Sequence, residues 1–121
     1  MRREPVITAE HPKMIDDELY ILLREENIAE FNTRRPREGT YALSGLDFRG
    51  LNLRGLDADG IDFSNSYFRQ ADLAGLNLSN CNMDGASIGG ANISGTRFPT
   101  ELSAQEIVMS LKYGTRLRYS S

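Results

Sequence analysis

The chain has 121 residues and a formal net charge of −3, from 14 Lys and Arg against 17 Asp and Glu, with one Cys and one His. One cysteine excludes an intrachain disulfide, and one Cys with one His supplies too few ligands for a typical structural zinc site. No apolar run approaches the ~20 residues of a membrane-spanning helix, and the acidic balance argues against direct nucleic-acid binding. We therefore expect one small soluble, cytoplasmic domain that contacts neither membrane nor nucleic acid.

The composition divides the chain into three parts. All nine Glu and both Lys lie outside residues 41–98, where Gly, Asp, Asn and apolar residues dominate. We expect an N-terminal arm and helical cap over 1–40, a repeat domain over 41–98, and a C-terminal helical cap and tail over 99–121.

The first part begins with an arm, residues 1–13, which contains two prolines and is expected to be extended and mobile. His11 lies in this arm, where it is expected to be solvated and not catalytic. Asp16 or Asp17 can cap a short helix after the arm.

A second short helix is expected from Asn27 and Glu30, which have the spacing of a capping box. The first helix carries Leu19, Tyr20, Leu22 and Leu23, and the second carries Ile28 and Phe31. We expect both helices to cover the N-terminal end of the repeat.

Residues 41–98 repeat with a period of five. In consecutive pentads from Tyr41 the sequence reads YALSG, LDFRG, LNLRG, LDADG, IDFSN, SYFRQ, ADLAG, LNLSN, CNMDG, ASIGG, ANISG, followed by TRF. The third position is always apolar, the second is Asp or Asn in eight of eleven units, and the fifth is Gly in eight. A period of five fits neither a continuous helix nor a flat strand. Each unit therefore predicts a very short strand with its first and third side chains inward, followed by a corner at which Gly supplies positive φ.

These units resemble the pentapeptide-repeat family, whose consensus is A(D/N)LXX. The resemblance covers residues 41–98 and implies a right-handed quadrilateral parallel β-helix with four pentads per coil. The expected fold class is an all-β solenoid of about three coils with helical caps, namely short N-terminal helices and one C-terminal helix.

Four pentads per coil would stack residues that lie twenty apart. The third positions then form four apolar columns, Leu43/Phe63/Met83, Phe48/Phe68/Ile88, Leu53/Leu73/Ile93 and Ala58/Leu78/Phe98. The first positions of the first coil are mostly larger than the Ala that the family prefers, which predicts a broader or less regular first coil. Cys81 falls in an inward column and is expected to be a buried apolar residue and not a reactive thiol.

The C-terminal part predicts one helix. Ser103 and Glu106 form a capping box, so the helix should begin at Ala104 and run to about Tyr113, with Gly114 just beyond its end. Ala104, Ile107, Val108 and Leu111 fall on one face of this helix. We expect them to cover the C-terminal end of the core; the alternative is a homodimer contact through this end cap and the tail.

The sequence holds no constellation that is typical of an enzyme. Six Asp lie in the repeat, mostly at the second position, where short polar side chains serve the outer surface and the corners. The glycines recur every five residues and do not open a helix, unlike those of a phosphate-binding loop. We therefore predict no catalytic, metal-binding or cofactor-binding residue, and no cofactor.

Surface arginines and tyrosines are the remaining signal, since both residue types are enriched at protein interfaces. The candidate partner-binding surface consists of Arg49, Arg54, Tyr67 and Arg69 and, from the basic tail, Arg116, Arg118 and Tyr119. Stacking by twenty places Arg49 above Arg69. The alternative is that these arginines form a solvated face balanced by Asp47 and Asp72.

Two functions follow. The first is a non-catalytic module that binds an unknown protein partner. The second comes from the resemblance, since some pentapeptide-repeat proteins mimic duplex DNA and modulate type II topoisomerases such as DNA gyrase. Residues 41–98 hold six Asp and four Arg, a net charge of only −2, on a short column, so charge and length disfavour this alternative.

Overall fold

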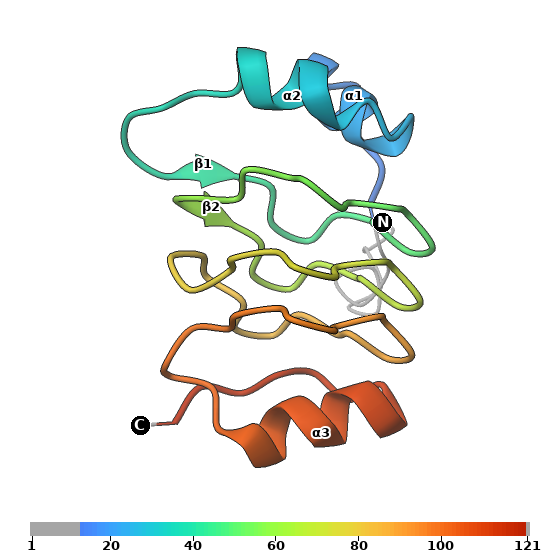
Figure 1. Cartoon of the computed structure of the whole chain (residues 1–121), viewed down its shortest axis with the longest axis vertical. Coiled ribbons are helices and arrows are strands. Elements are labelled where there is room, and N and C mark those ends of the chain that lie inside the picture. Colours follow the sequence, from blue (N-terminus) through green and yellow to red (C-terminus); the bar gives the residue numbers. More distant parts are fainter. Residues whose placement is uncertain (1–12, 121) are drawn as a thin grey trace, which may run out of the picture.

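The structure is a computed structural model that describes residues 13–120, and the expectations for residues 1–12, His11 included, lie outside the described residues. Two helices, α1 (Glu18–Arg24) and α2 (Ile28–Arg34), lie at one end of the molecule, and α3 (Ala104–Tyr113) lies at the other. The repeat forms a stack between them, as Figure 1 shows.

The stack has the predicted twenty-residue register. The strands β1 (Tyr41–Ala42) and β2 (Ile61–Asp62) pair in parallel, with Tyr41 opposite Ile61. Further parallel bridges also join residues twenty apart, among them Asp47 to Tyr67 and Tyr67 to Ser87. We refer to residues 41–60, 61–80 and 81–98 as layers 1, 2 and 3.

Regular β-structure covers only part of the predicted solenoid. In the described part of the chain β1 and β2 form one two-stranded sheet, and the other pairings are single bridges. Each pentad contributes one or two extended residues before it turns, so the strands are too short to extend the sheet further.

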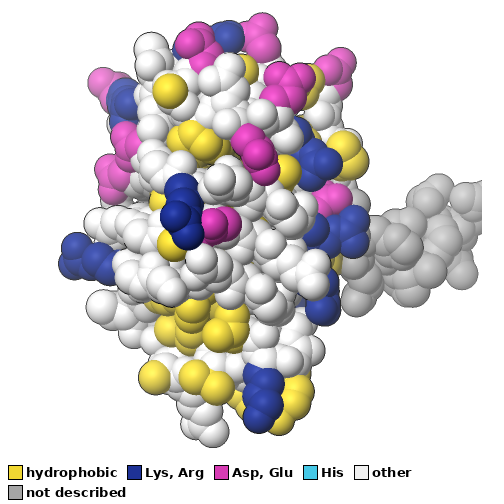
Figure 2. Space-filling model, turned by 45° about the vertical axis from the view of Figure 1, so that its right-hand side comes forward, with side chains coloured by type: hydrophobic (Ala, Val, Ile, Leu, Met, Phe, Trp, Pro, Cys, Tyr) yellow, Lys and Arg dark blue, Asp and Glu magenta, His cyan; other side chains and the backbone are white. Residues whose placement is uncertain are grey.

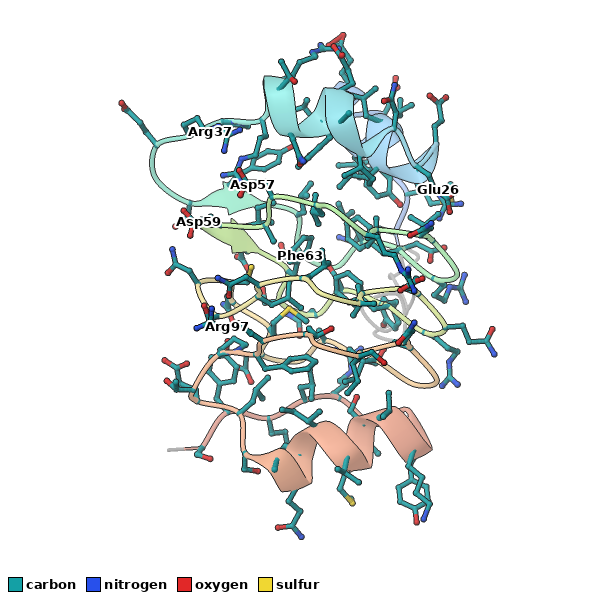
Figure 3. All side chains as sticks on the ribbon, in the orientation of Figure 1. Glu26, Arg37, Asp57, Asp59, Phe63 and Arg97 are labelled. Atoms are coloured by element: carbon teal, nitrogen blue, oxygen red, sulfur yellow. The ribbon has the colours of Figure 1, made fainter. Side chains whose placement is uncertain are left out.

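The core consists of the first and third positions of the pentads, as predicted. These side chains are buried throughout layers 1 to 3 except for Tyr41, Ile93, Thr96 and Phe98, which are half-buried near the ends of the repeat. Three phenylalanines form its centre (Phe63 is labelled in Figure 3), with ring centroids 5.1 Å apart for Phe48 and Phe68 and 5.2 Å apart for Phe63 and Phe68. Cys81 is 7% exposed, in agreement with the inward column expected for it.

The corners explain the Asp or Asn at the second position. In all eight units that have one, its side-chain oxygen accepts a hydrogen bond from the backbone N–H of the fourth position, at 2.9–3.3 Å. The fifth position adopts a positive φ in every complete unit except the one that ends at Asn80, and this φ is 60° even at Asn65 and Gln70. A short polar side chain therefore fixes each corner, and Gly is preferred after it because Gly tolerates this backbone conformation.

One part of layer 1 departs from the stacking. Leu56–Ala58 forms no bridge to the residues twenty positions later, and the Gly60 N–H donates to the Asn80 carbonyl, one residue beyond the position seen at the other corners. The α2 region binds this segment instead, since Asn32 accepts from the Asp57 N–H and the Arg35 guanidinium donates to the Asp57 carbonyl. The less regular first coil expected from the sequence is confined to this pentad.

The N-terminal helices close the open edge of layer 1 with polar side chains. The Asp47 carbonyl accepts from the Tyr20 hydroxyl at 2.7 Å, and the Asn52 N–H donates to the Glu26 carboxylate at 2.7 Å. Lys13, expected to be mobile, pairs with Leu46 in a parallel bridge and takes the place of a preceding layer.

Of the two side-chain caps predicted for the N-terminal helices, the structure shows one. Asp17 caps α1 by accepting from the Tyr20 N–H. Asn27 makes no side-chain capping bond at α2, so the second capping box is absent. The cause is the tight junction between the helices, in which Glu26 has a φ of 60° and the Asn27 N–H donates to the Leu22 carbonyl to end α1.

The bounds of α3 are those predicted, with the Ser103 side chain accepting from the Glu106 N–H and Gly114 at a φ of 74°. Its predicted inward face is wrong in part, since Ala104 is exposed and Val108 is 57% exposed. The buried residue of α3 is Ser110. Its hydroxyl accepts from the Ile88 N–H and donates to the Thr115 carbonyl, which turns the helix so that Val108 faces outward.

The C-terminal tail, residues 115–120, closes part of layer 3. Arg116 forms an antiparallel bridge with Ser87, and Leu117 is fully buried against the core. Figure 1 shows the tail passing between α3 and layer 3. Leu117 of the tail therefore covers the C-terminal end of the core together with Ile107 and Leu111 of α3, a role that the sequence analysis assigned to α3 alone.

Candidate partner-binding surface

The described residues contain little that catalysis or metal binding would need. No group of three or more His, Cys, Asp or Glu within residues 13–120 could hold a metal ion. Burial raises the pKa of the Cys81 thiol to about 12, so the thiolate that a nucleophile requires is scarce at neutral pH. None of the helices described is long and apolar enough to cross a bilayer.

Arg49 extends from the fourth position of the second pentad of layer 1 and is held by Asp47, two residues earlier. The Nε of Arg49 lies 2.9 Å from Oδ1 of Asp47, and its Nη2 lies 3.0 Å from Oδ2. Burial alone would raise the pKa of Asp47, but the hydrogen bonds from Arg49 outweigh it and leave that pKa below its usual range. The Arg49 side chain is still 51% exposed.

Arg54 occupies the same position in the next pentad and pairs with the layer below. Its Nε lies 2.7 Å from Oδ2 of Asp72, and its side chain is 58% exposed. The Ala74 N–H and the Arg54 guanidinium lower the pKa of the Asp72 carboxyl. Arg49 and Arg54 are thus positioned by acidic neighbours and remain accessible.

Arg69 lies one layer below Arg49 and differs from it, because no hydrogen bond or ion pair joins its guanidinium to any residue within 13–120. The guanidinium instead packs against backbone. A Cβ atom added at Gly114 would lie 2.5 Å from its Nη2, and one added at Gly89 would lie 3.3 Å from its Nη1. Glycine at both positions therefore makes room for this side chain.

The three candidates from the tail are engaged with the stack or with α3. The Arg116 guanidinium donates to the Tyr67 hydroxyl at 2.9 Å and lies 5.5 Å from the centre of its ring. Arg118 pairs with Glu106 at 3.0 Å, and the Tyr119 hydroxyl accepts from the Met83 N–H at 2.8 Å. The sequence analysis placed Tyr67 and the tail residues on one surface, and the structure gives each of them an intramolecular partner.

Arg24, which the sequence analysis missed, joins the arginines of the stack. It lies in the last turn of α1 and lines a surface pocket of about 400 Å³ together with Asp47, Arg49, Gly50, Arg69 and Gln70. Figure 2 shows Lys and Arg side chains gathered along one side of the molecule, with Asp and Glu among them. In the sequence, Arg24 is only a basic residue near the C-terminus of a predicted helix. Basic residues are common at that position, so the sequence does not indicate a binding site there.

Comparison with family models finds pentapeptide repeats, in eight copies, over residues 42–70 and 61–98. No curated protein and no solved structure matches the chain. Residues 42–98 are therefore a run of pentapeptide repeats, the family that the five-residue period, the buried third positions and the twenty-residue register together indicate.

Proposed function

We propose that this chain is a non-catalytic protein-interaction module, built as a right-handed quadrilateral β-helix, that binds a protein partner through its arginine-bearing side. The arginine face consists of Arg49, Arg54 and Arg69. Arg49 and Arg69 lie at the fourth positions of the second pentads of layers 1 and 2, and Arg54 lies at the fourth position of the third pentad of layer 1. Pentapeptide-repeat proteins in general are structural or interaction modules, which supports the general class of function.

The observation that carries the proposal is the exposure of these arginines on a scaffold whose interior is filled. Phe48, Phe63 and Phe68 occupy the centre of the stack and leave the binding chemistry to the outer positions of the pentads. Ion pairs with Asp47 and Asp72 hold Arg49 and Arg54 in place, and close contact with Gly89 and Gly114 restricts Arg69. A partner would therefore meet charged groups with little freedom left to lose.

Affinity capture from the native cell tests this proposal. The wild-type chain is compared with an Arg49→Gln/Arg54→Gln/Arg69→Gln variant and with Arg97→Gln, a matched control that removes one exposed arginine from a different pentad. Figure 3 shows Arg97 on the side of the stack opposite Glu26. We expect the triple variant to lose partners that the wild type and the Arg97 variant retain. Recovery of the same partners with all three forms would contradict the role of the arginine face.

DNA mimicry is not part of the proposal, because two of the acidic groups that it would use, Asp47 and Asp72, are paired with arginines. A gyrase supercoiling assay separates the two functions. We expect micromolar protein to leave supercoiling unchanged, and a change would favour the topoisomerase alternative.

A further inference from the structure

The pocket formed by Arg24, Asp47, Arg49, Gly50, Arg69 and Gln70 carries an excess of positive charge. Three guanidinium groups and one carboxylate line a volume of about 400 Å³. The whole chain has a formal net charge of −3, so the sign of the charge in this pocket is opposite to that of the protein.

The one carboxylate of the pocket is already occupied. Both oxygens of Asp47 accept hydrogen bonds from Arg49, and its side chain is only 10% exposed. Arg24 donates to the backbone carbonyl of Asp47, a neutral acceptor, at 3.3 Å. The charges of Arg24 and Arg69 therefore have no acidic hydrogen-bonded partner among the residues that the structure describes.

The positions of these two charges are set by separate elements. Arg24 comes from the end of α1, and Arg69 comes from a corner of layer 2, where close contact with Gly89 and Gly114 restricts its guanidinium. Gly50 lines the same pocket, and nothing lies within 4 Å of the position that its Cβ would occupy. The pocket thus holds two spare cationic donors with room for a guest group.

We infer that this pocket binds a carboxylate side chain from an acidic segment of a protein partner. Guanidinium groups form charge-assisted hydrogen bonds with carboxylates, and a single pocket with two spare charges matches one such group better than a continuous polyanion. Duplex DNA needs a long basic stripe to release many counterions, and the acidic balance of this chain opposes that. The inference rests on the proposed interaction function and names the chemistry of the partner.

The test is a titration of the full chain with a synthetic hexaglutamate peptide, followed by ¹⁵N–¹H NMR of the backbone amides. We expect shift changes centred on Arg24, Gly50 and Gln70, and an affinity that falls as salt is raised. Arg69→Gln should weaken binding about tenfold, as expected for the loss of one charged hydrogen bond, whereas Arg97→Gln should change it less than twofold. A circular-dichroism spectrum equal to that of the wild type shows that each variant is folded, and Arg24→Gln provides a second pocket variant.

Four results would overturn the inference. The first two are equal weakening by the Arg97 and Arg69 variants and shift changes that avoid the pocket. The third is binding of inorganic phosphate at these amides without binding of the peptide. The fourth is binding of a 20-base-pair DNA duplex at these amides in preference to the peptide.

The affinity-capture experiment tests the proposed function independently of this inference. If the peptide misses the pocket but captured partners still depend on the arginine face, the interaction function stands and only the carboxylate pocket fails. If the peptide binds as expected and no partner depends on the arginine face, the proposed function fails alone.

Discussion

The two ends of the stack are closed in different ways. At the N-terminal end, side chains from the helical region meet the backbone edge of layer 1, with Tyr20, Glu26 and Asn32 each bonded to a different pentad. At the C-terminal end, a returning segment of backbone lies along layer 3, with the Leu117 N–H and carbonyl both bonded to it. Each end also uses the other device, since the Lys13 main chain pairs with layer 1 and the hydroxyls of Ser110 and Tyr119 accept from layer 3. A repeat that cannot close on itself can therefore be finished by polar side chains and by added main chain in different proportions.

The two closures also differ in how much they cover. At the C-terminal end the first two pentads of layer 3 are covered, whereas the N–H groups of Ile93 and Gly95 in the third pentad have no hydrogen-bond partner among residues 13–120. At the N-terminal end, the second, third and fourth pentads of layer 1 are each bonded to the cap region. The helical cap thus protects more of its edge than the tail does.

A substitution at Phe68 tests whether one continuous core joins the two ends of the stack. We expect Phe68→Ala to lower the free energy of unfolding by about 3–5 kcal/mol, because it empties a fully packed site. Urea unfolding followed by circular dichroism measures the change. Val108→Ala is the control, with an expected change within about 0.5 kcal/mol because Val108 is exposed. A loss below about 1 kcal/mol at Phe68 would show that the stacking register is wrong.

A matched pair of tyrosines compares the two closures directly. Tyr20→Phe removes a donor to the Asp47 carbonyl, and Tyr119→Phe removes the acceptor for the Met83 N–H. We expect losses of about 1–3 kcal/mol for Tyr20, which is 1% exposed, and about 0.5–1.5 kcal/mol for Tyr119, which is half-buried. Thermal unfolding of the two variants shows which substitution causes the larger loss of stability. A larger loss at Tyr119 would reverse our view of which end is the more tightly closed.

Acid should weaken the ion pairs at both ends of the stack and those between the ends. Hydrogen bonds from arginines lower the pKa values of Asp47, Asp57 and Glu106, and those from the Ala74 N–H and the Arg54 guanidinium lower the pKa of Asp72. A carboxyl whose pKa is lower in the folded state stabilises that state above its unfolded pKa and loses this effect as pH falls through the folded value. We therefore expect stability to be constant near neutral pH and to fall below about pH 4.

Asp57→Asn sharpens this prediction at the N-terminal end, where Asp57 pairs with Arg35 and Arg37. Arg37 and Asp57 are labelled in Figure 3. The variant should be less stable at pH 7 and show a flatter decline between about pH 5 and pH 2. Glu106→Gln is the corresponding change at the C-terminal end. Denaturant midpoints measured across this range check both, and an unchanged slope in the Asp57 variant would contradict the assignment.

The smallest effect concerns the corners between the ends. Gln70 holds a φ of 60° that glycine adopts without strain, so Gln70→Gly should stabilise the fold by about 0.5–1 kcal/mol. Asn80 is the matched control, because its φ is not positive and Asn80→Gly should destabilise the fold by a similar amount. Chemical denaturation of the two variants would show opposite signs, and equal signs would contradict the role assigned to the corner.

The repeat was predictable because its information is local. Each pentad carries its own inward residues, and most carry a corner-fixing Asp or Asn and a glycine, so the core follows from the spacing. The twenty-residue register follows from the resemblance to the pentapeptide-repeat family. The helix bounds were also predictable, since Ser103 and Gly114 mark the two ends of α3. These features depend on neighbours within a few residues or on an exact period.

The ends were less predictable because their contacts join residues that share no period. The orientation of α3 depends on the hydroxyl of Ser110, which meets layer 3, and nothing near Ser110 in the sequence indicates that contact. The same holds for Arg24, which lies beside Arg69 only because α1 packs over layer 1. The partial irregularity at Leu56–Ala58 likewise arises from Arg35, a residue outside the repeat.

The twenty-residue register has a consequence for how such a chain can change in length. Twenty residues return the chain to the same side of the stack, so each pentad is one quarter of a circuit. Inserting one pentad would rotate α3 and the tail by a quarter of a turn about the axis of the stack, relative to α1 and α2. Only insertions or deletions of four pentads preserve the mutual orientation of the two caps, and with it every surface to which both ends contribute.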